Sequence, residues 1–516
     1  MLARLQTAAV CGVEAIPVSV EVDVSGGLPG MTMVGLPDAS VRESRERVRS
    51  AIRNSGFPMP NGHITVSLAP ADVRKVGAAF DLPIALGVLA ASGALPHRGR
   101  GDRREGPLVA GGVSLDGGVP AMRGVLPIAA AAQRAQPPAL LFPHANLAEA
   151  AIVSEVALYP VKSLFDAAQI YCAEQPVAAS RPAVADDTAL PVTDDLADVA
   201  GQLLARRALE IAAAGGHHLL LSGPPGAGKT MLARRLPGVL PPLTEDEALA
   251  VTTIHSVAGT LPAGAGLLRV RPFRAPHHTA SDIALVGGGT NPRPGELSLA
   301  HHGVLFLDEL PEFARRVLDT LRQPLELGTI TIARAARTVT FPARVMLVGA
   351  MNPCPCGYAG DPRRPCRCSP IAVERYQSRL SGPLRDRFDL TVEVRAVPWR
   401  ELRGAATAES SAVVRARVVA ARAIQRARAG VLNAALEGPA LRAACRLDAA
   451  GERLLSLAMS RQLLTARGAS RLLRVARTIA DLAGRAEIAA ADVAEALPFR
   501  AETGRESGVA QMEKWT

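Results

Sequence analysis

Residues 223–230 read Gly-Pro-Pro-Gly-Ala-Gly-Lys-Thr, the glycine, lysine and threonine spacing of a phosphate-binding loop. An apolar stretch, Leu219 to Leu221, precedes the loop, and a helix is predicted after it. Glycines allow backbone N–H groups to converge on phosphate oxygens, and the helix N-terminus adds partial positive charge. Lys229 is suited to bridge the β- and γ-phosphates, and the Thr230 hydroxyl to bind Mg²⁺. The predicted nucleotide-binding residues are Gly223, Pro224, Pro225, Gly226, Ala227, Gly228, Lys229 and Thr230.

Two further apolar stretches end in polar side chains that suit the same chemistry. Residues 304–307 are followed by Asp308 and Glu309, which predicts a magnesium carboxylate and a residue that polarises the attacking water. The stretch "ARVMLVGAMN" ends in Asn352, which is suited to sense the γ-phosphate. A turn residue before Pro353 is an equally good interpretation of that asparagine.

Four of the seven cysteines lie in the stretch "CPCGYAGDPRRPCRC". Cys354, Cys356, Cys366 and Cys368 offer four thiolates on a Gly/Pro-rich loop, which predicts a structural Zn²⁺ site next to Asn352. Free thiols and a redox switch remain alternatives, although the usual redox spacing of two intervening residues is missing.

Composition separates broad classes of protein. Hydrophobic residues make up 48% of the 516, which is enough for several cores, and the length favours two to four domains. No apolar run is long enough to cross a membrane, and we expect a cytoplasmic protein with reduced thiols. The formal net charge of +10 permits a nucleic-acid partner but also fits an arginine-rich surface.

The pattern along the chain predicts a multi-domain α/β protein. Residues 1–172 mix short strands and helices as an α+β domain, and 173–194 are predicted to be a linker. Strands and helices alternate over 195–392, which indicates a parallel-sheet core with the cysteine insertion at 354–368. Residues 393–500 are predicted to form a helical lid, and 501–516 a disordered tail.

The long segments resemble a known family. "GPPGAGKT", "VLFLDE", Asn352 and "SGPLRDRFDL" together look like an AAA+ ATPase, and "RPFRAPHHTASDIALVGGG" and "RLLRVARTIADLAG" are similar to the magnesium-chelatase branch. With the N-terminal region included, nearly the whole chain resembles the ComM/YifB family. This resemblance implies ATP and Mg²⁺ as cofactors and a homo-hexameric ring.

The resemblance also implies roles for two arginines. Arg387 matches the arginine finger that reaches the neighbouring subunit's nucleotide, with Arg385 as the nearest competitor. Arg467 matches the sensor-2 position of the lid, with Arg474 as the alternative. A finger that acts in trans requires a ring, since each site then borrows a residue from its neighbour.

Two segments are candidates for contacts with DNA. Residues 267–296 are predicted to project from the core and to present Arg271 and Arg274, and 328–343 are predicted to form a hairpin with Arg334 and Arg337 near its tip. In the branch that the chain resembles, such insertions face the central pore, where basic side chains suit phosphates regardless of sequence. An ordinary hairpin with exposed arginines is the alternative.

Two adjacent histidine pairs, His277–His278 and His301–His302, are interpreted as packing and loop residues rather than metal ligands, because neighbouring side chains point to different faces. The N-terminal region resembles the proteolytic domain of Lon proteases (ribosomal S5 domain 2-like). Ala79 and Leu126 stand where that domain has its catalytic serine and lysine. Neither side chain supports covalent catalysis, so no peptidase activity is expected.

The function that follows from the resemblance is an ATP-dependent hexameric DNA motor. A branch-migration helicase acting in homologous recombination during natural transformation is the specific expectation, with DNA of single-stranded or branched form as the partner. A magnesium-chelatase motor subunit is the first alternative, disfavoured because that subunit is expected to lack the N-terminal domain. An ATP-switched scaffold and a Lon-like protease are the others.

Overall fold

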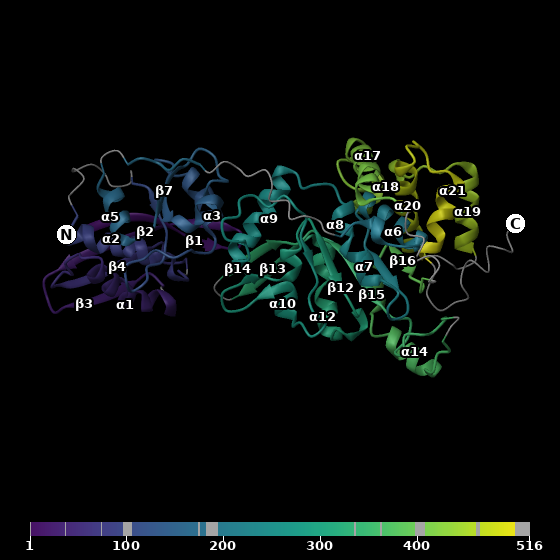
Figure 1. Cartoon of the computed structure of the whole chain (residues 1–516), viewed down its shortest axis with the longest axis horizontal. Coiled ribbons are helices and arrows are strands. Elements are labelled where there is room, and N and C mark those ends of the chain that lie inside the picture. Colours follow the sequence, from purple (N-terminus) through teal and green to yellow (C-terminus); the bar gives the residue numbers. More distant parts are fainter. Residues whose placement is uncertain are drawn as a thin grey trace.

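The structure, a computed structural model, describes most of the chain. The described residues are 2–36, 38–73, 75–95, 106–173, 176–181, 194–334, 337–361, 364–397, 408–460 and 465–500. Most of the predicted linker and the whole predicted tail, 501–516, therefore lie outside the described residues. Figure 1 shows the N-terminal domain at one end, a central α/β part and a group of C-terminal helices at the other end.

The N-terminal domain is built on a seven-stranded sheet in the order β3-β4-β2-β1-β5-β6-β7. Its long antiparallel hairpin pairs Cys11 with Glu14 at the tip, where Gly12 has a φ of +63°. Such a left-handed position favours glycine. The strands are β1 (Leu2–Cys11), β2 (Glu14–Ser25), β3 (Gly30–Val34), β4 (His63–Ala69), β5 (Leu108–Val109), β6 (Ala139–Pro143) and β7 (Ala157–Val161).

Helices cover both faces of this sheet. Residues of α1 (Ala39–Asn54), α2 (Asp81–Ala91) and α5 (Leu164–Cys172) share one hydrophobic core with the sheet. Those of α3 (Val125–Gln133) and α4 (Leu147–Ala150) share another. Val109 of β5 lies in the first core and Leu108 in the second, as expected when successive side chains alternate between faces.

The start of the predicted linker packs on the N-terminal domain instead of hanging free. The Ala179 N–H donates to Leu158 O at 2.8 Å, and Arg181 Nη1 donates to Ala151 O and Val153 O, each at 2.8 Å. These bonds extend the N-terminal domain to at least residue 181.

The central sheet is parallel and has the order β16-β8-β15-β12-β9. Leu219 and Leu221 of β8 enter one core and Leu220 the other, so both faces of the sheet are buried. The strands are β8 (Leu219–Ser222), β9 (Phe273–Arg274), β12 (Val304–Leu307), β15 (Met346–Met351) and β16 (Leu390–Glu393). All five end at the same edge, where ligands of such sheets bind.

Helices cover both faces of the central sheet. The first core contains α6 (Leu203–Gly215), α7 (Lys229–Arg234) and α8 (Leu236–Val239) together with lid residues. The second core contains α12 (Arg315–Thr320) and α15 (Gly382–Arg385). Two short helices, α13 (Arg322–Leu327) and α14 (Pro370–Gln377), follow α12 and the cysteine segment respectively.

The segment 267–296 is not a wholly projecting loop, and that part of the prediction is wrong. Phe273 pairs with Val304 and Arg274 with Leu305, so β9 is an edge strand of the core sheet. A strand of two residues has too little periodicity for the sequence to reveal it. After β9 come α10 (Asp282–Val286), β10 (Gly287–Gly288), β11 (Arg293–Pro294) and α11 (Glu296–Leu299).

The predicted hairpin is present and lies against the N-terminal domain. β13 (Thr329–Arg334) pairs antiparallel with β14 (Arg337–Pro342), and Arg334 and Arg337 are opposite each other at its end. A Cβ added to Gly12 would lie 2.9 Å from Val339 Cγ1, so the tip of the β1–β2 hairpin touches β14. Figure 1 shows both elements at the junction, together with α9 (Glu245–Ala258).

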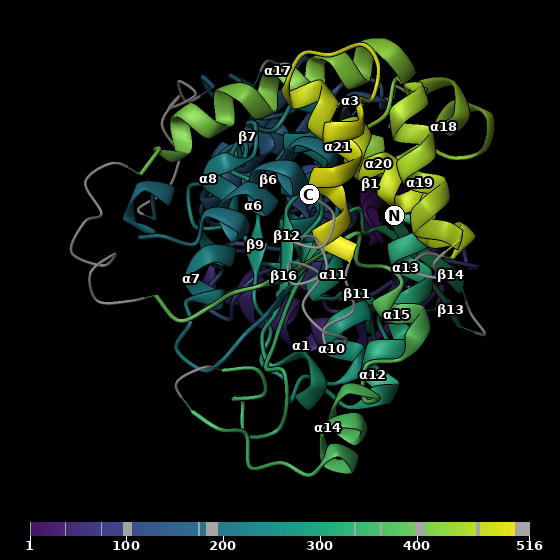
Figure 2. The same cartoon turned by 90° about the vertical axis from the view of Figure 1, so that its right-hand side faces the viewer.

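The C-terminal helices form a lid over the first core. α17 (Ser411–Ala429) and α20 (Ala466–Leu482) pack on α6, and the buried Arg422 donates to Ala213 O at 2.9 Å and 2.6 Å. Figure 2 shows these helices in front of the central sheet. They are α17 (Ser411–Ala429), α18 (Gly438–Ala444), α19 (Ala449–Ser460), α20 (Ala466–Leu482) and α21 (Ala490–Ala496). Among the described helices, none has the length and apolar character needed to span a membrane.

Candidate nucleotide and metal sites

The predicted phosphate-binding loop joins β8 to α7, as its sequence requires. Gly226 and Gly228 have φ values of +75° and +94°, in the left-handed region that favours glycine. A Cβ on Gly223 would lie 2.1 Å from Val394 O, so this position has no room for a side chain. The glycine at 223 therefore lets the start of the loop pack against the backbone that follows β16.

Lys229 is buried beneath this loop. Its Nζ donates to Gly223 O at 2.6 Å, to Pro224 O at 3.0 Å and to Asn352 Oδ1 at 3.0 Å. Burial lowers the pKa of Lys229, while the negative charges of Asp308 and Glu309 oppose that shift. The ammonium thus has three acceptors to exchange for phosphate oxygens.

Thr230 and Asp308 form the second contact of the site. The Thr230 hydroxyl donates to Asp308 Oδ2 at 2.7 Å, and Asp308 Oδ1 accepts from the Glu309 N–H at 2.9 Å. A hydroxyl beside a carboxylate, next to a phosphate-binding loop, supplies the hard oxygen ligands that Mg²⁺ prefers. The residues present therefore fit the predicted magnesium site.

The order of the strands explains how Asn352 joins this group. β15 lies between β8 and β12, so the residue that follows β15 lies between Lys229 and Asp308. A sheet in which β8 and β12 were neighbours would exclude Asn352. The contact with Lys229 Nζ is the observation that supports the sensor interpretation over the turn interpretation.

Glu309 pairs with His278, which the sequence analysis interpreted only as a packing or loop residue. His278 Nδ1 lies 3.0 Å from Glu309 Oε2, and Glu309 has a φ of +51°, a strained value for a residue with a side chain. His278 follows β9, the edge strand beside β12. Recognition of β9 is the signal that would have placed His278 at the same edge as Glu309.

The rings of the second histidine pair lie against each other, with centroids 4.0 Å apart, so these side chains do not point to different faces as expected. His301 is buried, and its Nδ1 accepts from the Arg344 N–H at 3.0 Å. Burial, followed by the charges of His302 and Arg344, lowers the pKa of His301 to about 3. His301 is therefore a neutral packing residue.

The predicted arginine finger and sensor lie away from these contacts. Arg387 Nη2 lies 2.5 Å from Glu326 Oε1, and Arg385 Nη2 donates to Gln377 O at 3.2 Å. Arg467 is exposed in the first turn of α20, whereas Arg474 is mostly buried, 4.0 Å from Glu437. Their roles toward a nucleotide remain predictions.

The lid also contacts the finger segment through Arg471, a residue that sequence reasoning did not single out. Arg471 Nη1 lies 3.4 Å from Asp386 Oδ1. Asp386 directly precedes Arg387, so this contact joins the lid to the segment of the predicted finger.

Two of the four predicted DNA contacts are engaged inside the protein. Arg271 is buried and donates to Pro241 O, Pro242 O, His302 O and Glu247 Oε2. Arg274 makes a two-pronged ion pair with Glu296 at 2.7 and 2.8 Å. Both guanidinium groups stabilise the fold around β9, and a contact of either one with DNA stays a prediction. The prediction for Arg334 and Arg337 is unaffected.

The four clustered cysteines come together in space. Their Sγ atoms all lie within 4.8 Å of one another, and Cys354 is buried. Cys354 Sγ lies 3.3 Å from Cys356 Sγ and 3.6 Å from Cys366 Sγ. Such distances exclude disulfide bonds, whose sulfur atoms are about 2.05 Å apart. The cluster therefore has the ligand set of a tetrahedral zinc site.

Neither position that would supply peptidase chemistry in the N-terminal domain has a reactive side chain. Ala79 lies in a short helix and accepts a hydrogen bond from the Gly111 N–H, and Leu126 is buried at the start of α3.

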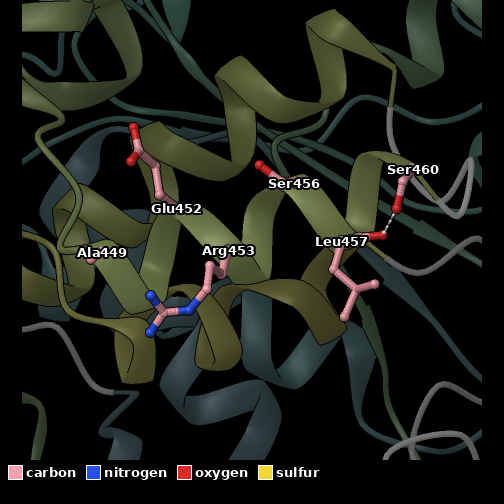
Figure 3. Close-up of a pocket in the computed structure, with 6 residues that line it drawn as sticks. All are labelled: Ala449, Glu452, Arg453, Ser456, Leu457 and Ser460. Atoms are coloured by element: carbon pink, nitrogen blue, oxygen red, sulfur yellow. Dashed lines mark hydrogen bonds between the residues drawn. The ribbon is translucent and has the colours of Figure 1, made fainter.

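A separate hollow lies on the lid and contains none of these groups. Figure 3 shows its lining, which comes from a single helix, α19: Ala449, Glu452, Arg453, Ser456, Leu457 and Ser460.

Three family models match the chain, and the description of each one names a subunit of magnesium chelatase. "Subunit ChlI of Mg-chelatase" matches residues 20–146, "Magnesium chelatase, subunit ChlI" 195–402, and its C-terminal model 408–500. Because one of them covers the N-terminal region, that region alone does not argue against the chelatase alternative, contrary to our expectation from the sequence.

Relatives that match over the full length have other names. Competence protein ComM of Haemophilus influenzae is 45% identical over 505 residues, 97% of each chain. The uncharacterised protein YifB of Salmonella typhimurium is also 45% identical over 505 residues, 97% of each chain. The magnesium-chelatase 67 kDa subunit of Heliobacterium mobile is 26% identical over 186 residues, 31% of this chain and 28% of that protein.

Proposed function

Because the chain belongs to the ComM/YifB family of magnesium-chelatase-like AAA+ proteins, we propose that it is an ATP-driven motor acting on DNA. Its specific role is branch migration in homologous recombination during natural transformation. It works as a homo-hexamer in the cytoplasm, where both ATP and the chromosome are found. The observation that supports this best is the convergence of Lys229, Thr230, Asp308 and Asn352 at one edge of the sheet.

The arrangement of side chains suits hydrolysis of a nucleoside triphosphate. Lys229 would exchange its contact with Asn352 for the β- and γ-phosphates, which frees the Asn352 amide to contact the γ-phosphate. Glu309 is suited to orient and polarise the attacking water, with His278 fixing its carboxylate. Mg²⁺, held by Thr230 and Asp308, would supply charge neutralisation when bound.

The site of a single chain supports the proposed ring. Among the described residues, no guanidinium group of the single chain hydrogen-bonds to Thr230 or Asp308. Arg387 of an adjacent subunit would complete the site in trans, and its planar cation suits the charge that develops on the phosphoryl group. Arg467, exposed at the lid, is proposed to sense the nucleotide.

DNA is the cargo that the hairpin favours. β13 and β14 form a two-stranded element with an arginine on each strand at the end of the pairing. In a ring lined by six such hairpins, the cations would contact backbone phosphates without reading the sequence.

A chelatase-type motor subunit and an ATP-switched scaffold remain the alternative functions. The ATP site supports the DNA motor, the chelatase subunit and the scaffold equally, since these functions differ in what the protein acts on and not in how it binds ATP. Coverage favours the DNA motor, because the ComM relative matches 97% of this chain and the chelatase relative 31%. A Lon-like protease is disfavoured by Ala79 and Leu126.

We further propose that Cys354, Cys356, Cys366 and Cys368 hold a structural zinc ion. No redox step is required of these thiols in the motor.

ATP hydrolysis measured with and without DNA tests the proposed function. We expect DNA to stimulate turnover of the wild-type protein, and Lys229→Ala to abolish turnover under both conditions. A rate of ATP hydrolysis that DNA does not change, together with no binding of DNA, would contradict the DNA motor and favour the scaffold or the chelatase subunit.

A further inference from the structure

We infer that the metal-bound cysteine loop forms one wall of the nucleotide site, so that zinc occupancy controls nucleotide affinity. This inference rests on the proposed ATP and zinc binding and goes beyond both. It assigns the metal a role in binding the nucleotide, because the cysteine loop that the metal orders contacts the phosphate-binding loop.

The cysteine geometry suits one ion. Zinc–sulfur bonds of about 2.3 Å in a tetrahedron place the sulfur atoms about 3.8 Å apart. The separations of Cys366 Sγ from Cys354 Sγ and from Cys356 Sγ are both 3.6 Å, close to that value. Backbone N–H groups also point at the sulfurs: Ala359 N to Cys354 Sγ at 3.3 Å and Cys368 N to Cys366 Sγ at 3.4 Å. N–H donors of this kind stabilise thiolates that bind a metal.

The loop touches the phosphate-binding loop at a glycine. Gly357, next to Cys356, has a φ of +84°. A Cβ added there would lie 2.5 Å from Pro225 Cδ and 2.8 Å from Pro225 Cγ. The backbone of the cysteine loop therefore packs directly on Pro225, with no side chain between them.

The cysteine loop is also linked to the nucleotide site through the residues that precede it in the chain. Cys354 is two residues after Asn352, whose Oδ1 accepts from Lys229 Nζ at 3.0 Å. The residue before Asn352, Met351, accepts from the Gly223 N–H at 3.2 Å. A shift of Cys354 would therefore be felt by both Lys229 and the start of the phosphate-binding loop.

The far end of the cysteine segment is also anchored near Asn352. α14 follows the last cysteine, and Gln377 Nε2 donates to Pro353 O at 3.1 Å. Both ends of the segment thus meet beside the nucleotide site, while its middle has no helix or strand among the described residues. Four metal–sulfur bonds are what can give such a loop a fixed shape.

Without the ion, no bonds tie the four sulfur atoms together, and the loop loses its fixed shape. Pro225 then loses a packing surface and Asn352 loses its fixed position, so the phosphate-binding loop samples more conformations before it binds. A binding-competent state that is less populated lowers the apparent affinity in proportion.

The experiment measures zinc content by mass spectrometry and the affinity for a fluorescent ADP analogue, on full-length protein before and after chelation. We expect about one zinc ion per chain and about tenfold weaker binding after chelation, restored by zinc but not by magnesium. Cys366→Ser should behave like the chelated protein, and Cys172→Ser, outside the cluster, like the wild type. Zinc well below one per chain, or equal affinity with and without it, would overturn the inference.

Two glycines of the loop provide a matched pair that leaves the cysteines intact. Gly357 and Gly360 have similar φ values of +84° and +80°, but a Cβ on Gly360 meets nothing within 4 Å. Gly357→Ala should keep zinc and weaken nucleotide binding about tenfold, whereas Gly360→Ala should bind nearly as the wild type. Equal affinities of the two variants would contradict the contact with Pro225.

The outcomes separate this inference from the proposed function. If the zinc-loaded wild type fails to bind the nucleotide, the proposed function fails and the inference with it. If the wild type binds equally well with and without zinc, the inference alone fails.

Discussion

Glu309 combines a left-handed backbone, with a φ of +51°, and a carboxylate that lies 3.0 Å from His278 Nδ1. A strained backbone at a single residue persists where the surroundings fix it, and such positions cluster at functional sites. Asp308, directly before it, is held by Thr230. The two carboxylates are therefore oriented by different partners, which suits one to the metal and the other to the water.

The first prediction concerns His278 as a positioning residue. His278→Ala should lower kcat about tenfold with little change in KM, because the carboxylate of Glu309 loses its orientation while nucleotide binding is intact. His278→Gln, which keeps a donor, should recover part of the loss. Steady-state ATPase kinetics check this, with His277→Ala as the control, since His277 contacts Thr279 and not Glu309. A rise in KM at constant kcat would contradict the positioning role.

The second prediction concerns pH. Because the pKa of folded His301 is about 3 and that of an unfolded histidine about 6.5, the unfolded chain takes up the proton first as pH falls. The contribution of His301 to stability is full above about pH 6.5 and falls by about 1.4 kcal/mol at pH 5.5. Burial also lowers the pKa of His218 and His255, which makes the stability of the wild-type protein fall more steeply as the pH falls.

His301→Asn keeps an acceptor for the Arg344 N–H without a titrating group. Urea unfolding at pH 7.5 and pH 5.5 should show a smaller loss of stability for this variant than for the wild type. An identical pH dependence of the two proteins would show that His301 does not titrate on unfolding.

At the scale of helices and strands, the sequence predicted the elements that carry a long periodic pattern or a distinctive motif. The phosphate-binding loop, the hairpin 328–343 and the amphipathic helix at 411–429 needed only local patterns. β9 could not be found this way, because two residues carry no periodicity and its partner, β12, is about 30 positions away. Because β9 was not recognised, the sequence did not reveal that Arg271 and Arg274 make internal ion pairs, or that His278 lies beside Glu309.

The third prediction concerns the hairpin. A double variant, Arg334→Ala with Arg337→Ala, should weaken binding to DNA of any sequence and lower the salt slope of log affinity by about 2, one for each lost phosphate contact. DNA-stimulated hydrolysis should fall with it. Fluorescence anisotropy over a salt series checks this, with Arg134→Ala and Arg453→Ala as a control of equal charge. If the control pair loses as much affinity, the effect comes from net charge and not from the hairpin.

At the scale of the whole molecule, the described residues of the N-terminal domain contact the central α/β part at α9 and at the hairpin. Gly124 N–H donates to Ser256 O at 3.1 Å, and the Ser256 hydroxyl donates to the buried Glu149 carboxylate. The second place is the contact of Gly12 with β14. Since one contact is on α9 and the other on the hairpin, the N-terminal domain supports the element that is proposed to hold DNA. No local sequence pattern could predict these contacts, because they join residues over 100 positions apart.

The fourth prediction tests the ring through shared sites. Lys229→Ala and Arg387→Ala should each abolish hydrolysis, because one removes the phosphate cation and the other the finger of the neighbouring site. When the two variants are mixed, some interfaces contain an intact Lys229 facing an intact Arg387, so part of the activity should return. ATPase activity over mixing ratios checks this. Mixtures that stay inactive, despite mass measurements that show mixed rings, would exclude a finger acting in trans.

The central claim, a motor that converts ATP hydrolysis into remodelling of DNA, is tested most directly by strand displacement from a three-way DNA junction. The wild-type protein with ATP should displace the strand. Glu309→Gln, which still binds the nucleotide but hydrolyses it about 10²- to 10⁴-fold more slowly, should leave the junction intact. Displacement by Glu309→Gln at the wild-type rate, or no displacement by a wild-type protein that hydrolyses ATP in the presence of the junction, would contradict the claim.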